Sequence, residues 1–298
     1  MTASLAFGFF APSGVMLDAA AVDRATRNLL ALGHRVVEDE SVRDRHQRFA
    51  GDDAARLAAI ERIASRDDVD VAMALRGGYG FTRLLDRIDY AALTRKRKRW
   101  VGHSDFTAFQ LAAWSQARLV TYAGPMASYD LGAAEPSGFT LEHCFAMLTS
   151  TEHVVTVALD GPAPRSLEGT LWGGNLAMLV SLLGTRFAPA IDGGILFLED
   201  ISEHPYRIER MLYQLLHSGI LERQRAILLG AFSDYTLYPH DDGYDIGTVV
   251  AHFRERIDVP IYTGLPFGHV RDKLTMPFGG RASLDAGDGR AELVMRTT

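Results

Sequence analysis

The sequence contains little cysteine and no long apolar run. Cys144 is the one cysteine among 298 residues, so no intramolecular disulfide can form. Such usage fits a reducing compartment. The N-terminal residues include no early lysine or arginine, and their apolar run is too short for a secretory signal. No stretch approaches the ~18 apolar residues of a membrane span. We therefore expect a soluble, cytoplasmic protein with no membrane partner.

The sequence also has no excess of positive charge. The formal net charge is −6, which gives no global attraction to nucleic acid or to anionic membranes. The basic run at residues 95–99 is most simply a solvated segment. We expect no nucleic-acid partner.

Familiar metal and phosphate motifs are absent as well. His240, Asp241 and Asp242 could ligate a metal, but no H-E-x-x-H or comparable set accompanies them, and loop polarity explains them better. The glycine-rich residues 76–80 satisfy neither G-x-G-x-x-G nor the P-loop pattern. These glycines could form a tight turn or let the backbone approach a ligand closely. The sequence predicts no metal site.

Short apolar runs alternate with helical patterns through the first half of the chain, which predicts an α/β fold. Alternating strands and helices form parallel βαβ units, with helices on both faces of an open sheet. The predicted strands are residues 5–11, 35–38, 69–75, 100–103 and 119–123. The predicted helices are residues 18–33, 52–66, 81–88 and 106–117, and Cys144 is expected in the core, on a further helix.

The order of elements changes after about residue 150. Strands are predicted at 153–159, 166–171, 194–198 and 226–232, helices at 174–183 and 206–217, and a C-terminal hairpin at 281–298. A polar loop covers 234–245. The length of the chain favours two domains. We place the boundary within residues 150–165, with domains at 1–150 and 165–298.

Ser104 lies where a predicted strand turns into a predicted helix. A side chain there projects from the carboxyl edge of the sheet, where open α/β folds place their sites. The amide of Asp105 begins the next helix and could donate to an oxyanion. The G-x-S-x-G elbow is incomplete because Phe106 replaces its second glycine. A helix cap is the alternative role for Ser104.

Two further residues could complete a catalytic set. Glu199, followed by Asp200, ends an apolar strand, where a carboxylate could cap a helix or orient an imidazole. His269 follows a short strand, but ten histidines compete for the role of base. His103 adjoins Ser104, and because consecutive residues at a strand end point to opposite faces, we expect it to be a poor partner.

Landmarks follow one another along nearly the whole chain, at residues 11–13, 49–56, 76–80, 102–105, 173–176, 183–185, 198–200, 205–206, 210–212 and 268–270. Together they resemble the LD-carboxypeptidase family, which also includes the microcin-immunity serine hydrolases. One departure is His103, where the family usually carries an aromatic residue. This departure concerns substrate fit more than the nucleophile.

The resemblance implies a flavodoxin-like parallel-sheet N-terminal domain and a smaller, swivelling, β-rich α/β C-terminal domain. It also implies a catalytic triad of Ser104, Glu199 and His269. The oxyanion hole would use the amides of Asp105 and Gly77, with Gly78 the close alternative to Gly77. The site would therefore lie between the domains, a common place for a pocket.

The implied reaction is hydrolysis of the L,D-peptide bond before the terminal D-alanine of a murein tetrapeptide, as part of cell-wall recycling. It needs no cofactor, and the family suggests a homodimer. Arg76 is our candidate for the substrate's terminal carboxylate, because a guanidinium matches that group. A salt bridge between the domains is its alternative role.

Other functions stay open at this point. A microcin-immunity-type hydrolase would cleave aminoacyl-nucleotide amides. Trp172 could stack on such a base, although a core position suits it better. A non-catalytic two-lobed ligand-binding protein is a different class. A class I glutamine amidotransferase is disfavoured, because that chemistry uses a cysteine where Ser104 stands.

Overall fold

The first half of the chain builds most of an open six-stranded sheet. The computed structural model describes residues 4–162, 165–287 and 289–298. The strand order is β11-β5-β4-β3-β1-β2, and β1 to β5 are parallel. Their order is that of flavodoxin-like sheets, which confirms the predicted N-terminal architecture. The strands are β1 (Ala6–Phe10), β2 (Arg35–Glu38), β3 (Val71–Ala74), β4 (Arg99–Gly102) and β5 (Thr121–Ala123).

Five α-helices accompany this sheet in the described part of the first half. They are α1 (Ala19–Ala31), α2 (Asp53–Ser65), α3 (Tyr90–Thr94), α4 (Phe106–Ala117) and α5 (Gly138–Thr149). Helix α1 begins where Asp18 accepts a hydrogen bond from the Ala20 amide, and it buries Val22 and Leu29. Asp52 caps α2 in the same way. Capping acids and helical spacing of apolar residues therefore located both helices correctly.

The second half forms a seven-stranded mixed sheet in the order β10-β9-β8-β7-β12-β13-β6. Strands β7 to β10 are parallel, whereas β7, β12, β13 and β6 pair antiparallel. The strands are β6 (Glu152–Val157), β7 (Arg165–Asn175), β8 (Ile195–Ile201), β9 (Ala226–Ser233), β10 (Ile261–Thr263), β12 (Arg281–Gly287) and β13 (Arg290–Arg296). The helices are α6 (Leu176–Ser181), α7 (Pro205–His217) and α8 (Ile246–Arg256).

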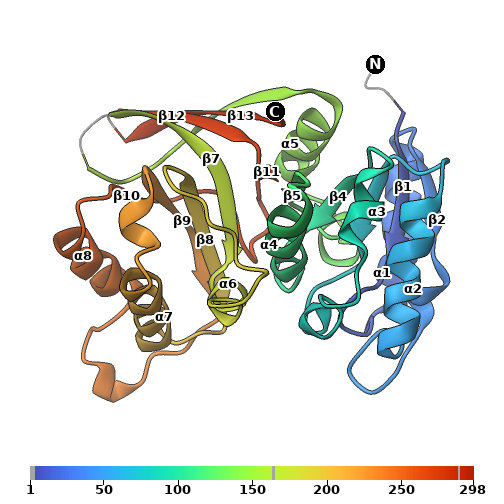
Figure 1. Ribbon diagram of the computed structural model, residues 1–298, viewed down its shortest axis with the longest axis horizontal. Coiled ribbons are helices and arrows are strands. Elements are labelled where there is room, and N and C mark those ends of the chain that lie inside the picture. Colours follow the sequence, from blue (N-terminus) through green and yellow to red (C-terminus); the bar gives the residue numbers. More distant parts are fainter. Residues whose placement is uncertain (1–3, 163–164, 288) are drawn as a thin grey trace.

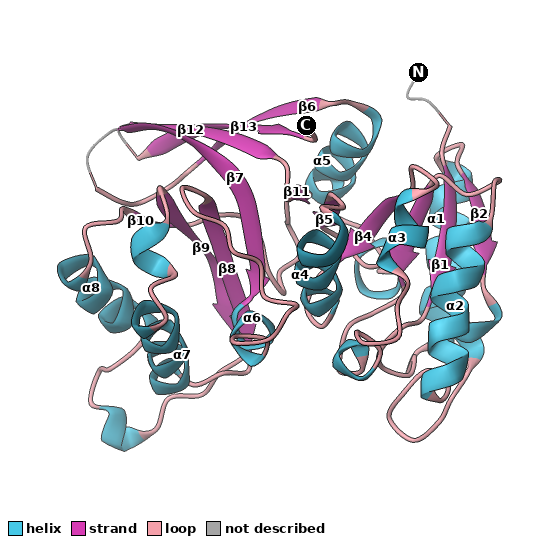
Figure 2. Cartoon of the chain, viewed as in Figure 1, coloured by secondary structure: helices cyan, strands magenta, loops and turns pink. Residues whose placement is uncertain are grey.

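Strand β7 joins the two parts of this sheet. Its first six residues pair with β12, and its last five pair with β8. Figure 2 shows it running from the β12–β13 hairpin toward α6. Helix α4 of the first half packs against β7 and α6, so it lies between the two sheets (Figure 1).

Strand β11 (Met276–Phe278) belongs to the second half of the sequence but to the first sheet, where it pairs antiparallel with β5. The sequence analysis missed this strand. Its central residue is Pro277, opposite Tyr122, and proline occurs in sheets mainly on edge strands because it cannot donate to the ladder. The chain then returns to the second sheet through β12. The domain limits 1–150 and 165–298, and the swivelling of the second domain, stay predictions.

Three other expectations were wrong. The predicted helix at 81–88 is a 3₁₀ turn, Phe81–Arg83, and the amides of Leu84 and Arg87 bond to carbonyls three residues back rather than four. The predicted helix at 174–183 is shorter, since Gly174 and Asn175 extend β7. The basic run is only partly solvated: Lys98 is buried and donates to the carbonyl oxygens of Arg66 and Val69.

Two core assignments hold. Cys144 is fully buried on α5, and Trp172 is buried with its indole N–H donating to Gln224 Oε1 at 2.9 Å. The C-terminal hairpin is β12–β13. Among the described residues, no helix combines the length and the apolar character that a bilayer crossing requires.

Helix α5 and strand β6 meet at a pair of histidines that makes stability depend on pH. His143 Nδ1 and His153 Nε2 lie 2.7 Å apart, and burial lowers the pKa of both imidazoles below the ordinary 6.5. The unfolded chain therefore binds more protons than the folded chain just below pH 6.5. This contribution to stability is present above that pH and is lost as the pH falls.

We predict that His153→Gln reduces the acid sensitivity of folding. The melting temperature of the wild type should fall more steeply than that of the variant between about pH 7 and about pH 5, because the variant lacks one group that must charge. His46→Gln, at an exposed position, is the control and should follow the wild type. If the melting temperature fell equally with pH in all three proteins, the histidine pair would not be a source of the acid sensitivity.

Candidate active site

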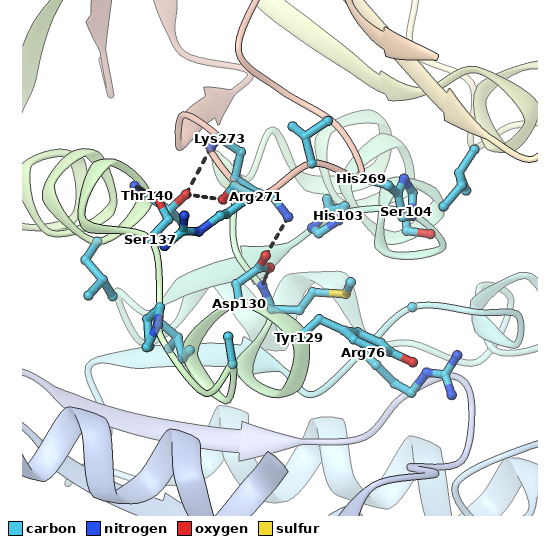
Figure 3. A pocket seen from close by; sticks show the side chains of 18 of the residues that line it. Arg76, His103, Ser104, Tyr129, Asp130, Ser137, Thr140, His269, Arg271 and Lys273 are labelled. Atoms are coloured by element: carbon cyan, nitrogen blue, oxygen red, sulfur yellow. Dashed lines mark hydrogen bonds and ion pairs between the residues drawn. The ribbon is translucent and has the colours of Figure 1, made fainter. Parts of the chain in front are cut away.

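A cavity of about 650 Å³ lies where the two halves meet. The first half contributes Ser104, the loop at 76–78 and a segment at 126–141, and the second half contributes Ile201 and residues from His269 to Lys273. Figure 3 shows Ser104, His103, His269 and Arg76 around this pocket. Pockets of this volume bind ligands of about the size of a drug molecule.

Ser104 occupies a sharp turn between β4 and α4. Its φ is +62°, a left-handed conformation that costs a non-glycine residue of order 1 kcal/mol or more. Such strain is typical of a nucleophile elbow, where the turn projects the hydroxyl from the sheet edge. The cap alternative gains no support, because no side chain caps α4 among the described residues.

Gly77 approaches Ser104 so closely that only glycine fits. A Cβ at residue 77 would lie 2.8 Å from Ser104 Cβ and 2.9 Å from its Oγ. The carbonyl of Gly77 is held by the Gly14 amide at 3.1 Å, which fixes the orientation of the loop. This contact brings the 76–80 loop to the Ser104 turn.

The amides of Gly77, Gly78 and Asp105 donate no hydrogen bond to any group in the described part of the chain. The Asp105 amide lies at the start of the twelve-residue helix α4 and 3.3 Å from the Cβ position of Gly77. Free amides near a serine Oγ can donate to a developing oxyanion. Gly78, at φ +101°, also lines the pocket.

Glu199 and His269 form a hydrogen-bonded pair. His269 Nδ1 lies 2.8 Å from Glu199 Oε2, and the carboxylate is fully buried in β8. Asn175 Nδ2 donates to the other oxygen at 3.2 Å. A Cβ at Gly268, whose φ is +126°, would lie 3.2 Å from Glu199 Cβ, so glycine lets the histidine loop approach. Because Nδ1 is engaged, Nε2 is the nitrogen available for catalysis.

Asp200 faces a different group. Its carboxylate accepts from Asn175 Nδ2 at 2.9 Å and from the amide of Ala177, at the start of α6, at 2.8 Å. Burial, and then the nearby Glu199 charge, raise the pKa of Asp200 to about 6. Of the two adjacent acids, Glu199 is therefore the one that contacts the imidazole.

Ser104 and His269 face the same pocket, but the hydrogen bonds within the described ranges do not join them directly. Catalytic hydrogen bonds are often long in proteins without substrate and shorten in the complex. The geometry thus brings together the three predicted residues and establishes one of their two expected contacts.

His103 and Ser104 line the same pocket, although consecutive strand residues were expected to point to opposite faces. No hydrogen bond joins the two residues in the described part of the chain, and the expectation that His103 is a poor partner for Ser104 stays a prediction. Side-chain alternation stops at Gly102, where β4 ends, and the left-handed Ser104 breaks it further. His103 Nδ1 is occupied by the Gly124 carbonyl at 2.9 Å, and its ring lies edge-on to His269 at 5.0 Å. Burial lowers the pKa of His103 well below its usual value, so the ring is neutral.

Arg76 lines the pocket but is partly occupied. One guanidinium nitrogen donates to the Val15 carbonyl at 2.8 Å, and the group lies over the Tyr129 ring. The ion pairs of the described residues do not include Arg76, so the alternative of an inter-domain salt bridge is not seen. Its Nε is buried and has no hydrogen-bond partner in the part of the chain that the structure describes.

The Asp105 side chain has a role that the sequence analysis missed. The buried carboxylate accepts from the Ser13 hydroxyl at 2.6 Å and from the Phe81 amide at 3.0 Å, and its burial raises its pKa. It thereby ties the Ser104 turn to the glycine loop and to the first loop of the chain. The sequence around Asp105 gave no sign of these contacts, because Ser13 and Phe81 lie 92 and 24 positions away along the chain.

Metal-ligating side chains do not gather in this pocket. No group of three or more histidine, cysteine or acidic residues is placed to hold a metal in the part of the chain that the structure describes. In the 240–242 segment, Asp241 instead accepts from His204 at 3.0 Å and from the Tyr238 amide.

Comparison with known proteins gives consistent results. Two family models match: the LD-carboxypeptidase N-terminal domain at residues 7–124 and the LD-carboxypeptidase C-terminal domain at residues 168–284. A probable murein peptide carboxypeptidase of Bacillus subtilis is 31% identical over 92% of this chain and 87% of its own. A murein tetrapeptide carboxypeptidase of Pseudomonas aeruginosa is 32% identical over 82% of this chain and 81% of its own.

Solved structures with a similar fold include members of the same family. The muramoyltetrapeptide carboxypeptidase from Oxalobacter formigenes is 44% identical, covers 98% of both chains and superposes with a TM-score of 0.91. The microcin C7 self immunity protein MccF, in complex with glutamyl sulfamoyl guanosine, covers 99% of this chain and 97% of its own with a TM-score of 0.90. At 21% identity, this second likeness shows the fold alone. The chain belongs to the LD-carboxypeptidase family and is an enzyme, a serine-type peptidase.

Proposed function

We propose that this peptidase hydrolyses the L,D-peptide bond before the terminal D-alanine of murein tetrapeptide, with Ser104, His269 and Glu199 as its triad. The observation that carries the proposal is the bond between the buried Glu199 and His269, which lines the same pocket as the strained Ser104. The names of the relatives from Pseudomonas aeruginosa and Oxalobacter formigenes support the substrate.

The proposed chemistry follows from the roles of the side chains. His269 Nε2 accepts the Ser104 proton as Oγ attacks the carbonyl carbon of the residue before D-alanine. Glu199 stabilises the resulting imidazolium through Nδ1. The amides of Asp105 and Gly77 donate to the oxyanion of the tetrahedral intermediate. The imidazolium then protonates the leaving amine, D-alanine departs, and water repeats the sequence on the acyl-enzyme. These steps require no cofactor.

Recognition of the terminal carboxylate is assigned to Arg76, with Gly78 beside it. The guanidinium lines the pocket two residues from Gly78, and one of its nitrogens is already held by Val15. A side chain held in this way loses little further freedom when it binds a carboxylate. The homodimer, the role in cell-wall recycling, the cytoplasmic location and the lack of nucleic-acid or membrane partners also remain proposals.

Cleavage of aminoacyl-nucleotide amides is the second candidate. Its support is the fold shared with MccF, which has been solved with aspartyl sulfamoyl adenosine. Trp172 does not help this candidate, because its ring is buried and bonded to Gln224. The substrate test below separates the two candidates.

Ser104→Ala should remove nearly all turnover while the fold persists, because the hydroxyl faces a pocket. Loss of a triad nucleophile costs about 10⁴–10⁶-fold in kcat. The measurement is D-alanine release from murein tetrapeptide, with circular dichroism as the folding control. More than roughly a tenth of wild-type activity would discard Ser104 as nucleophile.

Glu199→Gln should lower kcat by about 10³–10⁴-fold with little change in KM, since the carboxylate faces the base and not the substrate. Asp200→Asn is the matched control one residue away. Its carboxylate bonds Asn175 and the start of α6, so this change should affect thermal stability more than turnover. Severe loss in Asp200→Asn together with a nearly silent Glu199→Gln would move the assignment to Asp200.

Amidation of the C-terminus of the tetrapeptide should cost most of kcat/KM in the wild type, because the guanidinium of Arg76 would lose its charged partner. Arg76→Gln should narrow the difference between free and amidated peptides. Mass spectrometry of both digests measures the two rates. Equal wild-type rates would refute carboxylate recognition, and an inert tetrapeptide with a cleaved aminoacyl sulfamoyl adenosine would favour the second candidate.

A further inference from the structure

His269 lies on a segment that crosses from the second sheet to the first. Before it, the chain is bonded to β9: the Leu265 amide donates to the Leu229 carbonyl at 3.2 Å, and the Ala231 amide donates to the Phe267 carbonyl at 2.9 Å. Eight residues after Gly268, the chain has become β11 of the first sheet. The crossing segment, residues 268–275, therefore has one end in each half of the molecule.

The later part of this crossing segment is bonded to the first half at several points. Ser137 donates to Asp272 at 2.5 Å, and the Thr140 hydroxyl donates to the Arg271 carbonyl at 2.8 Å. The Lys273 amide in turn donates to the Thr140 hydroxyl at 3.0 Å. Figure 3 shows Thr140, Arg271 and Lys273 gathered on the side of the pocket opposite Arg76.

An ion pair lies at the centre of these contacts. Lys273 Nζ lies 2.6 Å from Asp130 Oδ1, and the side chains are 3% and 8% exposed. The second Asp130 oxygen accepts from the Met126 amide at 2.7 Å, so the carboxylate is held by a π-helical turn, Ala127–Leu131. A pair with so little exposure is hardly screened by solvent, and removing one partner leaves an uncompensated charge.

Ser104 and His269 line one pocket but are held by different halves of the molecule. Glu199 fixes His269 relative to the second sheet, whereas Ser104 belongs to the first sheet. Among the described contacts, Ser104 and His269 share no hydrogen bond that would set their distance. The packing of α4 on β7 and α6 holds the two halves together, and the attachment of the crossing segment acts closest to the imidazole, because Lys273 is four residues from His269.

We propose that Lys273 and Asp130 are positioning residues that hold the His269 segment against the first half and so keep the base in reach of the nucleophile. This rests on the proposed function, in which His269 is the base for Ser104. Because both side chains also line the pocket, the rival role is direct contact with substrate, and the two roles differ in what they change.

The test uses Asp130→Asn/Lys273→Met, which removes both charges together and avoids a lone buried ion. Asp130→Asn alone is the second variant: its amide oxygen can keep the bond from the Met126 amide, but the Lys273 charge stays buried without its partner, so we expect it to lose more thermal stability than the double variant. We expect kcat to fall about 10–100-fold with KM little changed, as for a small misplacement of a catalytic group. Labelling of Ser104 by a fluorophosphonate should slow by a similar factor, because it needs the base but no peptide.

Asp86→Asn is the control. Asp86 and Arg186 also join the two halves, at 3.0 Å, but the pair is exposed, and exposed pairs contribute little. This variant should keep the wild-type kcat and labelling rate. All assays are run well below the melting temperature of each variant, measured by circular dichroism.

Unchanged kcat and an unchanged labelling rate in a folded double variant would overturn the positioning role and leave the triad assignment intact. A raised KM with unchanged labelling would also overturn it, in favour of substrate contact. If the wild-type protein were not labelled at Ser104 at all, the triad assignment itself would fail, and the positioning role with it.

Discussion

The contact between the backbone at Gly77 and the side chain of Ser104 sets the geometry of everything around it. A methyl group at residue 77 would overlap the serine, so the loop and the turn can meet only because that position carries no side chain. Meeting there, they place amides from two distant segments beside one hydroxyl, and these amides donate no hydrogen bond among the described residues. Two other features serve this arrangement. The left-handed backbone of Ser104 directs its hydroxyl, and the buried Asp105 carboxylate holds the loops together.

Much of the fold could be predicted from local patterns. Capping acids located α1 and α2, and apolar runs located most of the strands to within a few residues. These features depend on neighbours in sequence, which is why the sequence reveals them. Strand β11 could not be found in this way, because three residues around a proline carry no period and their pairing with β5 depends on the whole chain.

The candidate site was predictable only in part. Ser104, Glu199 and His269 were named through a family resemblance, since each of them alone also fits a cap or a solvated position. The structure adds the contact between Glu199 and His269. The environment of His103, the Asp105 carboxylate and the Lys273–Asp130 pair had no local signal, because their partners lie 21 to 143 positions away. Long-range pairing of polar groups leaves no pattern in neighbouring residues.

The return of the chain to the first sheet at β11 has a consequence for synthesis. Until the ribosome has released residue 278, strand β5 has an open edge, and open edges pair readily with other chains. The first half must wait in this state while most of the second half is made, a period in which chaperones have the most to protect. His269 lies seven residues before that strand, so the proposed base is made only shortly before the strand that covers this edge.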